Sequence, residues 1–239
     1  MLAFASPTLI AAAVIPAVVL LVYIYRTDRL EKEPSGLLFS LLLSGVISTF
    51  LAALAEELGL YLFMGRFEED STIYNAVFYF IVVGGAEEGF KYLMLKKRTW
   101  NHPAFNCRYD GVVYAVFISL GFALWENIRY VLQYGFETAL LRAVTAVPGH
   151  ACFGVLMGVW YGMAKSAEKK GDTARSSLYR KLAVLLPMLV HGAYDFTATT
   201  KGLPVFIIFV AVMFIASFIM LRRNAKNDGY LPGNDWPQL

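Results

Sequence analysis

The chain of 239 residues is 58% hydrophobic and only 16% charged, with a formal net charge of +3. Soluble globular proteins are typically about 45–50% apolar and about 25% charged, so this composition excludes an ordinary soluble enzyme, a disordered chain and a fibrous repeat. Two cysteines are too few for a disulfide framework or a cysteine zinc site. The basic residues are scattered between apolar runs, so no nucleic-acid partner is expected. The sequence predicts a polytopic protein of a lipid bilayer.

Apolar runs that approach the roughly 20 residues needed to cross a bilayer occur seven times. The predicted spans are Thr8–Tyr25, Gly36–Ala55, Tyr74–Leu95, Asp110–Val131, Ala139–Met163, Leu182–Ala198 and Pro204–Leu221. The predicted fold class is therefore an all-α transmembrane helical bundle of about seven spans. It forms one domain over residues 1–223, followed by a short polar tail at 224–239.

The loops between these spans differ in charge. Sixteen lysines and arginines follow the odd-numbered spans, whereas four occupy the opposite side. The positive-inside rule then places the N-terminus outside and the C-terminus in the cytoplasm of a cell membrane. The acidic segment Glu56–Asp70 is predicted to be a loop that faces outward.

The middle four spans carry ionisable side chains, each of which costs roughly 2.5–3.5 kcal/mol at the bilayer centre and therefore points to function. They are Glu87, Glu88, Lys91, Glu126, His150, His191 and Asp195. If every acid were ionised and both histidines neutral, three negative charges would remain uncompensated. Protonation, a metal ion or water must compensate them. These conditions suit a hydrolytic site and equally an ion or proton pathway.

Helical spacing pairs several of these residues. Lys91 lies four residues after Glu87 and three after Glu88, so it can pair with either acid. A plain intrahelical salt bridge is the structural alternative, but it leaves the second glutamate unexplained. His191 and Asp195 are four residues apart and can bind each other, a water molecule or one metal ion, or simply hold two helices together.

Two further polar positions lie on the spans between these pairs. Glu126 is followed by Asn127 near the outer end of the fourth span, and the structural alternative is an interfacial acid paired with Arg129 or Arg142. His150 begins a row of small residues spaced by four, which favours close helix packing and points the histidine into the bundle. The row continues with Gly154, Gly158 and Gly162. A ring nitrogen bonded to a neighbouring backbone is the alternative for His150.

Taken together, four motifs on successive spans resemble the PrsW family of intramembrane proteases. The motifs are Glu87-Glu88-x-x-Lys91, Phe122-x-x-x-Glu126-Asn127, His150-x-x-x-Gly154 and His191-x-x-x-Asp195. That family looks related to the CAAX prenyl proteases, to bacteriocin-immunity-type membrane proteases and to the multipass scaffold subunit of γ-secretase. The resemblance covers roughly residues 75–200, which would be the catalytic core.

The resemblance implies a membrane-embedded endopeptidase that makes the first, outer-side cut in a membrane-anchored anti-sigma factor or a similar single-pass protein. Glu87 would be the general base, Glu126 would hold the water, and His191 would stabilise the oxyanion. Glu88 and Asp195 complete the expected catalytic set, and Lys91, Asn127 and His150 are expected to support it.

The sequence departs from the CAAX pattern at three positions. Lys91 stands where that branch has arginine one residue further on, Glu126 replaces a histidine, and Asp195 replaces an asparagine. An ionised aspartate cannot donate a hydrogen bond to an oxyanion, so the change favours either a neutral Asp195 or metal ligation. Nitrogen and oxygen donors suit Zn²⁺.

The metal-dependent form would use a set of four ligands, namely Glu87 (with Glu88 as its alternative), Glu126, His150 and His191. A form without any cofactor, in which a glutamate activates water directly, stays equally open. Two functions of other classes also remain open at this point. A proton- or ion-coupled transporter would use the same buried groups as a relay, although no repeated halves are visible. A scaffold without catalytic activity would bind the helix of a partner.

Overall fold

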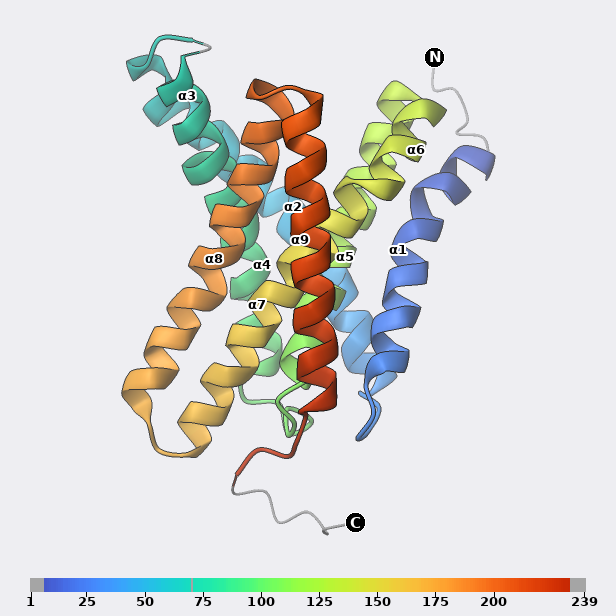
Figure 1. The fold of residues 1–239 in the computed structure, drawn as a ribbon, viewed down its shortest axis with the longest axis vertical. Coiled ribbons are helices and arrows are strands. Elements are labelled where there is room, and N and C mark those ends of the chain that lie inside the picture. The colour runs from blue at the N-terminus through green and yellow to red at the C-terminus, as the bar shows by residue number, and fades with distance from the viewer. Residues whose placement is uncertain (1–6, 70, 233–239) are drawn as a thin grey trace.

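The structure, a computed structural model, describes residues 7–69 and 71–232 (Figure 1). Within these ranges the chain is helical, and its single β-type contact is an isolated bridge between Cys107 and Tyr230. The α-helices are α1 (Pro7–Thr27), α2 (Ser35–Phe63), α3 (Thr72–Ala76), α4 (Gly84–Thr99), α5 (Asp110–Tyr134), α6 (Phe136–Val144), α7 (Ala146–Lys169), α8 (Thr173–Thr200) and α9 (Leu203–Lys226). The 3₁₀ turn η1 (Met64–Arg66) and the π-helix η2 (Val77–Val83) complete the elements.

The predicted all-α membrane bundle is confirmed. Six helical stretches of the described chain are long and apolar enough to cross a membrane: α1, α2, α5, α6 with α7, α8 and α9. The remaining predicted span, Tyr74–Leu95, corresponds to α3, η2 and α4, which follow one another without a break from Thr72 to Thr99. Because the π-helical turns divide this stretch, none of its three helices alone reaches the length of a span.

The helices run alternately up and down, and α1 begins at the end of the bundle opposite to the end at which α9 finishes (Figure 1). Helix α5 lies at the centre, with most of its residues from Asp110 to Ala123 fully buried. The predicted small-residue row of α7 packs directly on α5. A Cβ atom added at Gly154 would lie 2.9 Å from Cα of Val116. The glycines therefore let the two helices approach at backbone contact and turn His150 into the interior.

The predicted outward loop Glu56–Asp70 is wrong over its first half. Helix α2 continues to Phe63, two turns beyond the predicted end at Ala55. Its last turns still pack against η2 through Gly59, where an added Cβ atom would lie 2.7 Å from Val82. Asp70 lies outside the described residues.

The predicted fifth span is two helices rather than one. Helix α6 ends at Val144, and α7 begins at Ala146 after Thr145, whose backbone is not helical (φ −121°, ψ −76°). Pro148 gives the reason, because a proline ring clashes with the carbonyl four residues earlier and cannot donate to it. Proline is tolerated in the first turn of α7, where the amide would have no partner in any case.

Residues just after α9 return to the loop before α5. The Leu231 amide donates to the Asn106 carbonyl at 2.6 Å, and the Leu231 side chain is buried. Tyr109 donates its amide to the Asp228 carboxylate at 2.8 Å. The first part of the predicted tail is therefore packed on the bundle. Residues 1–6 and 233–239, at the ends of the predicted domain and tail, lie outside the described residues.

Candidate functional site

Within the described part of the chain, a polar cavity of about 330 Å³ lies between seven elements of the bundle. Its lining comes from α2, η2, α4, α5, α6, α7 and α8. The ionisable lining residues are Glu56, Glu87, Glu126, Arg129, Arg142, His150, His191 and Asp195. Four of the five residues expected to be catalytic thus share one cavity. Glu88, the fifth, is fully buried next to it.

Lys91 is the centre of a buried network beneath the cavity and has no exposed surface. Its ammonium group lies 2.7 Å from Oε1 of Glu88, 3.1 Å from Oε2 of Glu87 and 3.1 Å from Nδ1 of His150. It also lies 3.9 Å from the ring centre of Phe122, a cation–π distance. One lysine therefore meets both glutamates, as the spacing predicts, and additionally links α4 to α7.

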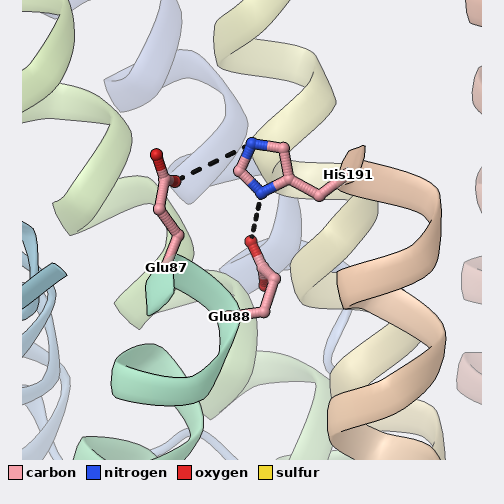
Figure 2. Close-up of side chains that lie close together, drawn as sticks. All are labelled: Glu87, Glu88 and His191. Atoms are coloured by element: carbon pink, nitrogen blue, oxygen red, sulfur yellow. Dashed lines mark hydrogen bonds and ion pairs between the residues drawn. The ribbon is translucent and has the colours of Figure 1, made fainter. Parts of the chain in front are cut away.

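His191 connects α8 to both glutamates of α4 (Figure 2). Its Nδ1 lies 2.9 Å from Oε1 of Glu88, whereas its Nε2 lies 3.8 Å from Oε2 of Glu87 and 3.5 Å from Oδ2 of Asp195. The ring of Phe153 stacks on the imidazole with 4.5 Å between centres. Both ring nitrogens of His191 thus face carboxylates, and the ring orientation is fixed by packing.

Glu126 is held by two cations or potential cations from neighbouring helices. Its Oε2 accepts from Nη2 of Arg142 at 2.8 Å and lies 2.9 Å from Nε2 of His150. The pairing with Arg142 is one of the structural alternatives that the sequence left open, and it coexists with a position on the cavity wall. Asn127 does not line the cavity. It accepts from Nε of Arg142 at 3.0 Å and donates to the Ala13 carbonyl at 2.8 Å, so it orients the arginine.

Close backbone contact brings α4 and α8 together at this level. A Cβ atom on Gly84 would lie 2.8 Å from the Met188 carbonyl oxygen, and one on Gly192 would lie 2.7 Å from Cα of Phe80. The π-helix η2 ends at Val83, one turn before Glu87, and π-helical turns are frequent at functional sites. Small residues beside the glutamates and beside His191 therefore set the separation of the two motifs.

A metal ion would find three ligands here. One donor atom each from Glu87, Glu88 and His191 lies within 4.8 Å of the others, and all three side chains are buried. Among the described residues, Oε2 of Glu88 has no hydrogen-bond partner although it is inaccessible to solvent. An unpartnered buried carboxylate oxygen beside an imidazole fits a cation that prefers nitrogen and oxygen ligands.

This set differs from the four ligands expected from the sequence. Glu87 and His191 belong to it, but Glu126 and His150 do not. Both ring nitrogens of His150 already face protein partners, Lys91 and Glu126, and Glu126 is paired with Arg142. Glu88 is the third member of the set, because one ring nitrogen of His191 faces Glu87 and the other faces Glu88 (Figure 2).

Two residues of the site are absent from the site residues that the sequence predicts. Glu56 reaches the cavity from α2, and Phe153 packs on His191 from α7. For Glu56, the apolar residues that continue to Phe63 are the signal that the helix extends past the acid. Phe153 carries no comparable signal, since an aromatic residue in an apolar span is ordinary.

Comparison with known proteins adds an independent finding. Residues 33–221 match the family described as PrsW family intramembrane metalloprotease. The chain is 34% identical over 227 residues to Protease PrsW of Oceanobacillus iheyensis, covering 92% of this chain and 97% of that protein. It is 36% identical over 194 residues to Protease PrsW of Geobacillus kaustophilus, covering 81% of each.

A third relative is Protease PrsW of Bacillus subtilis, 33% identical over 193 residues, covering 80% of this chain and 83% of that protein. No solved structure gives a significant match.

Proposed function

Because the chain belongs to the PrsW family of intramembrane metalloproteases and is therefore a peptide hydrolase of the cell membrane, we propose that it makes the first cut in a membrane-anchored anti-sigma factor or a similar single-pass protein. Family membership favours the enzyme over the transporter and scaffold alternatives. The observation that carries the proposal is the cavity, which places Glu87, Glu126, His191 and Asp195 around one space.

The geometry supports Glu87 as the general base. Its carboxylate lines the cavity and is held by Lys91 at 3.1 Å, so it would be within reach of a water molecule that enters the cavity. Glu87 would take a proton from that water, which attacks the substrate carbonyl, and would return the proton to the departing amine. Glu126, fixed by Arg142 and His150, would hold the water from α5.

His191 and Asp195 would act on the opposite side of the reacting carbonyl. Glu88 binds Nδ1 of the imidazole and Phe153 stacks on its ring, so the other nitrogen, Nε2, is directed toward the cavity. A proton on Nε2 would stabilise the developing oxyanion, and Asp195 at 3.5 Å would keep it there.

The residues also fit a divalent ion. Glu87, Glu88 and His191 would hold it, and Zn²⁺ is the ion to which these donors are best matched. Bound there, Zn²⁺ would supply an activated water and polarise the carbonyl. In this form Lys91 would compensate one of the two glutamate charges and the ion would compensate the other, while Glu126 would remain the carboxylate that orients groups in the cavity.

The charge pattern supports a cut on the outer side. The cavity lies toward the end of the bundle at which α2 and α5 finish, and the positive-inside rule predicts that this end faces away from the cytoplasm. An outer-side cut requires a substrate that enters from that end or from the adjoining bilayer.

The test is cleavage of reconstituted single-pass substrates, including anti-sigma factors, by the purified protein. Glu87→Gln should lower the rate by roughly 100-fold or more, since a general base contributes about 10²–10⁴-fold. Glu88→Gln should lower it as well, because Glu88 orients His191. Metal content is measured by mass spectrometry on the same samples. A metal form requires bound Zn²⁺ in the unchanged protein, reduced occupancy in both variants, and inhibition by a chelator.

Glu57→Gln serves as the matched control, because Glu57 is exposed on α2 and does not line the cavity. Full cleavage by a folded Glu87→Gln protein would contradict the assigned base and ligand. Failure to cleave any outer-side juxtamembrane segment, with other membrane proteins cleaved, would contradict the anti-sigma-type substrate.

A further inference from the structure

The α2 wall of the cavity carries a single ionisable residue, Glu56. Residues three and four apart share a helix face, so Glu56 lies on the same row as Ala52 and Gly59, both of which are buried. Gly59 packs on η2, where an added Cβ atom would lie 2.7 Å from Val82. This contact turns Glu56 inward, whereas Glu57 is exposed on another face of α2.

Glu56 differs from the other acids of the site in having no partner. Glu87 and Glu88 pair with Lys91, Glu126 pairs with Arg142, and Asp195 faces His191. Within the described chain, no hydrogen bond or ion pair joins the half-buried carboxylate of Glu56 to another side chain. The Glu56 carboxylate is therefore available to bind a group that enters the cavity.

The surrounding charges do not neutralise this wall. Glu87 and Glu126 repel the Glu56 carboxylate across the cavity, while His191 and Lys91 attract it from a distance. Of the two arginines in the lining, Arg142 is already paired with Glu126. Arg129 lies against the ring of Tyr130 on its own helix, 5.4 Å from the ring centre, and no ion pair joins it to Glu56 in the described chain. A cavity wall with one unpaired negative group and restricted solvent favours a positively charged occupant.

We propose that Glu56 is a specificity-determining residue that binds a lysine or arginine side chain of the substrate, close to the cleaved bond. The inference rests on the proposed peptidase function and narrows its substrate class to segments with a basic residue at one defined position. A charge-assisted hydrogen bond in a partly buried site corresponds to a preference of about 10- to 100-fold over a neutral residue.

The experiment uses the full chain in liposomes with single-pass substrates that share one cleavable segment. Each position flanking the cleaved bond carries lysine, glutamine or glutamate in turn, and kcat/KM is measured for each. The unchanged protein should prefer lysine at one position by about 10-fold or more. Glu56→Gln should abolish that preference, and Glu56→Lys should reverse it toward glutamate. Glu57→Gln and Glu57→Lys should keep it.

The outcomes separate two failures. Cleavage without any charge preference, or an unchanged lysine preference in Glu56→Lys, would overturn the inference while leaving the peptidase intact. Absence of cleavage by the unchanged protein would remove the proposed function and this inference together. Size-exclusion profiles of each variant identify a folding defect, and the isosteric Glu56→Gln keeps the test decisive if Glu56→Lys does not fold.

Discussion

Lys91 illustrates how one residue can determine the charge state of a whole site. Its ammonium group has three polar neighbours and an aromatic ring around it, and no solvent. Removing one partner of a buried ion pair is far more damaging than replacing the pair, because the other charge stays buried without compensation. The lysine is therefore structural support for both glutamates, of which Glu87 is the proposed general base.

We expect Lys91→Met to lower the free energy of unfolding by about 3–5 kcal/mol. The double variant Lys91→Met/Glu88→Gln should recover part of this loss, because it removes a carboxylate that the lysine would have neutralised. Thermal unfolding in detergent measures both. Equal destabilisation of the single and double variants would contradict a direct ionic role.

Glu33, in the loop between α1 and α2, provides a pH-dependent contribution to stability. Burial raises the pKa of Glu33 to about 7, against the lowering effect of the hydrogen bond from Tyr114. A carboxyl group with a raised pKa in the folded state stabilises the protein below its unfolded value near 4.5. That contribution is lost as pH rises through about 7.

The melting temperature should therefore fall between pH 6 and pH 8 by an amount that corresponds to roughly 1–2 kcal/mol. Glu33→Gln should flatten this dependence, because the amide stays neutral throughout. Glu69→Gln, an exposed change of equal charge, is the control. A pH profile that is the same in Glu33→Gln and the unchanged protein would show that other groups cause it.

At the scale of helices, the distance between α4 and α8 depends on glycine. We expect Gly192→Ala to push α8 away from η2, because the new Cβ atom would lie 2.7 Å from Cα of Phe80. His191 follows Gly192 in this shift, so kcat should fall by about 10- to 100-fold. Gly89→Ala on α4 is the matched control, since an added Cβ atom there meets nothing within 4 Å. Equal activity in both variants would show that catalysis does not depend on the close approach of α8 to η2.

What the sequence predicts about these helices depends on whether a contact lies within one helix. The pairs Glu87–Lys91 and His191–Asp195 follow from a spacing of four, and the structure places both as expected. Contacts between helices, such as Glu88 with His191, depend on how each helix is rotated, which periodicity alone does not determine. For this reason the group that the structure gathers, Glu87, Glu88 and His191, differs from the four ligands that the sequence suggests.

Helix ends were the other source of error. Acidic residues near the end of an apolar run resemble a loop, so Glu56 was assigned to solvent instead of the cavity. Hydropathy averages over a window and cannot tell an acid that faces a wet interior from one that faces water outside. The break at Thr145, in contrast, has a visible cause in Pro148 and could have been placed from the sequence.

For the whole molecule, the seven predicted crossings and the loop charges together predict a definite orientation. Single cysteines at Lys201, between α8 and α9, and at Gly171, between α7 and α8, should react with an impermeant maleimide from opposite sides of intact cells. The first should be labelled from outside and the second only after permeabilisation. Labelling of both from the same side would contradict the predicted topology.

The arrangement of charges within α4 bears on how the protein is made. Glu87, Glu88 and Lys91 belong to one helix, so two opposite charges are already paired when that helix leaves the ribosome and enters the bilayer. His191 belongs to α8 and joins them only after most of the chain has been inserted. Of the two acids that α4 carries into the membrane, one can therefore be compensated by Lys91 at once, whereas the proposed hydrolytic centre is complete only after α8 has been inserted.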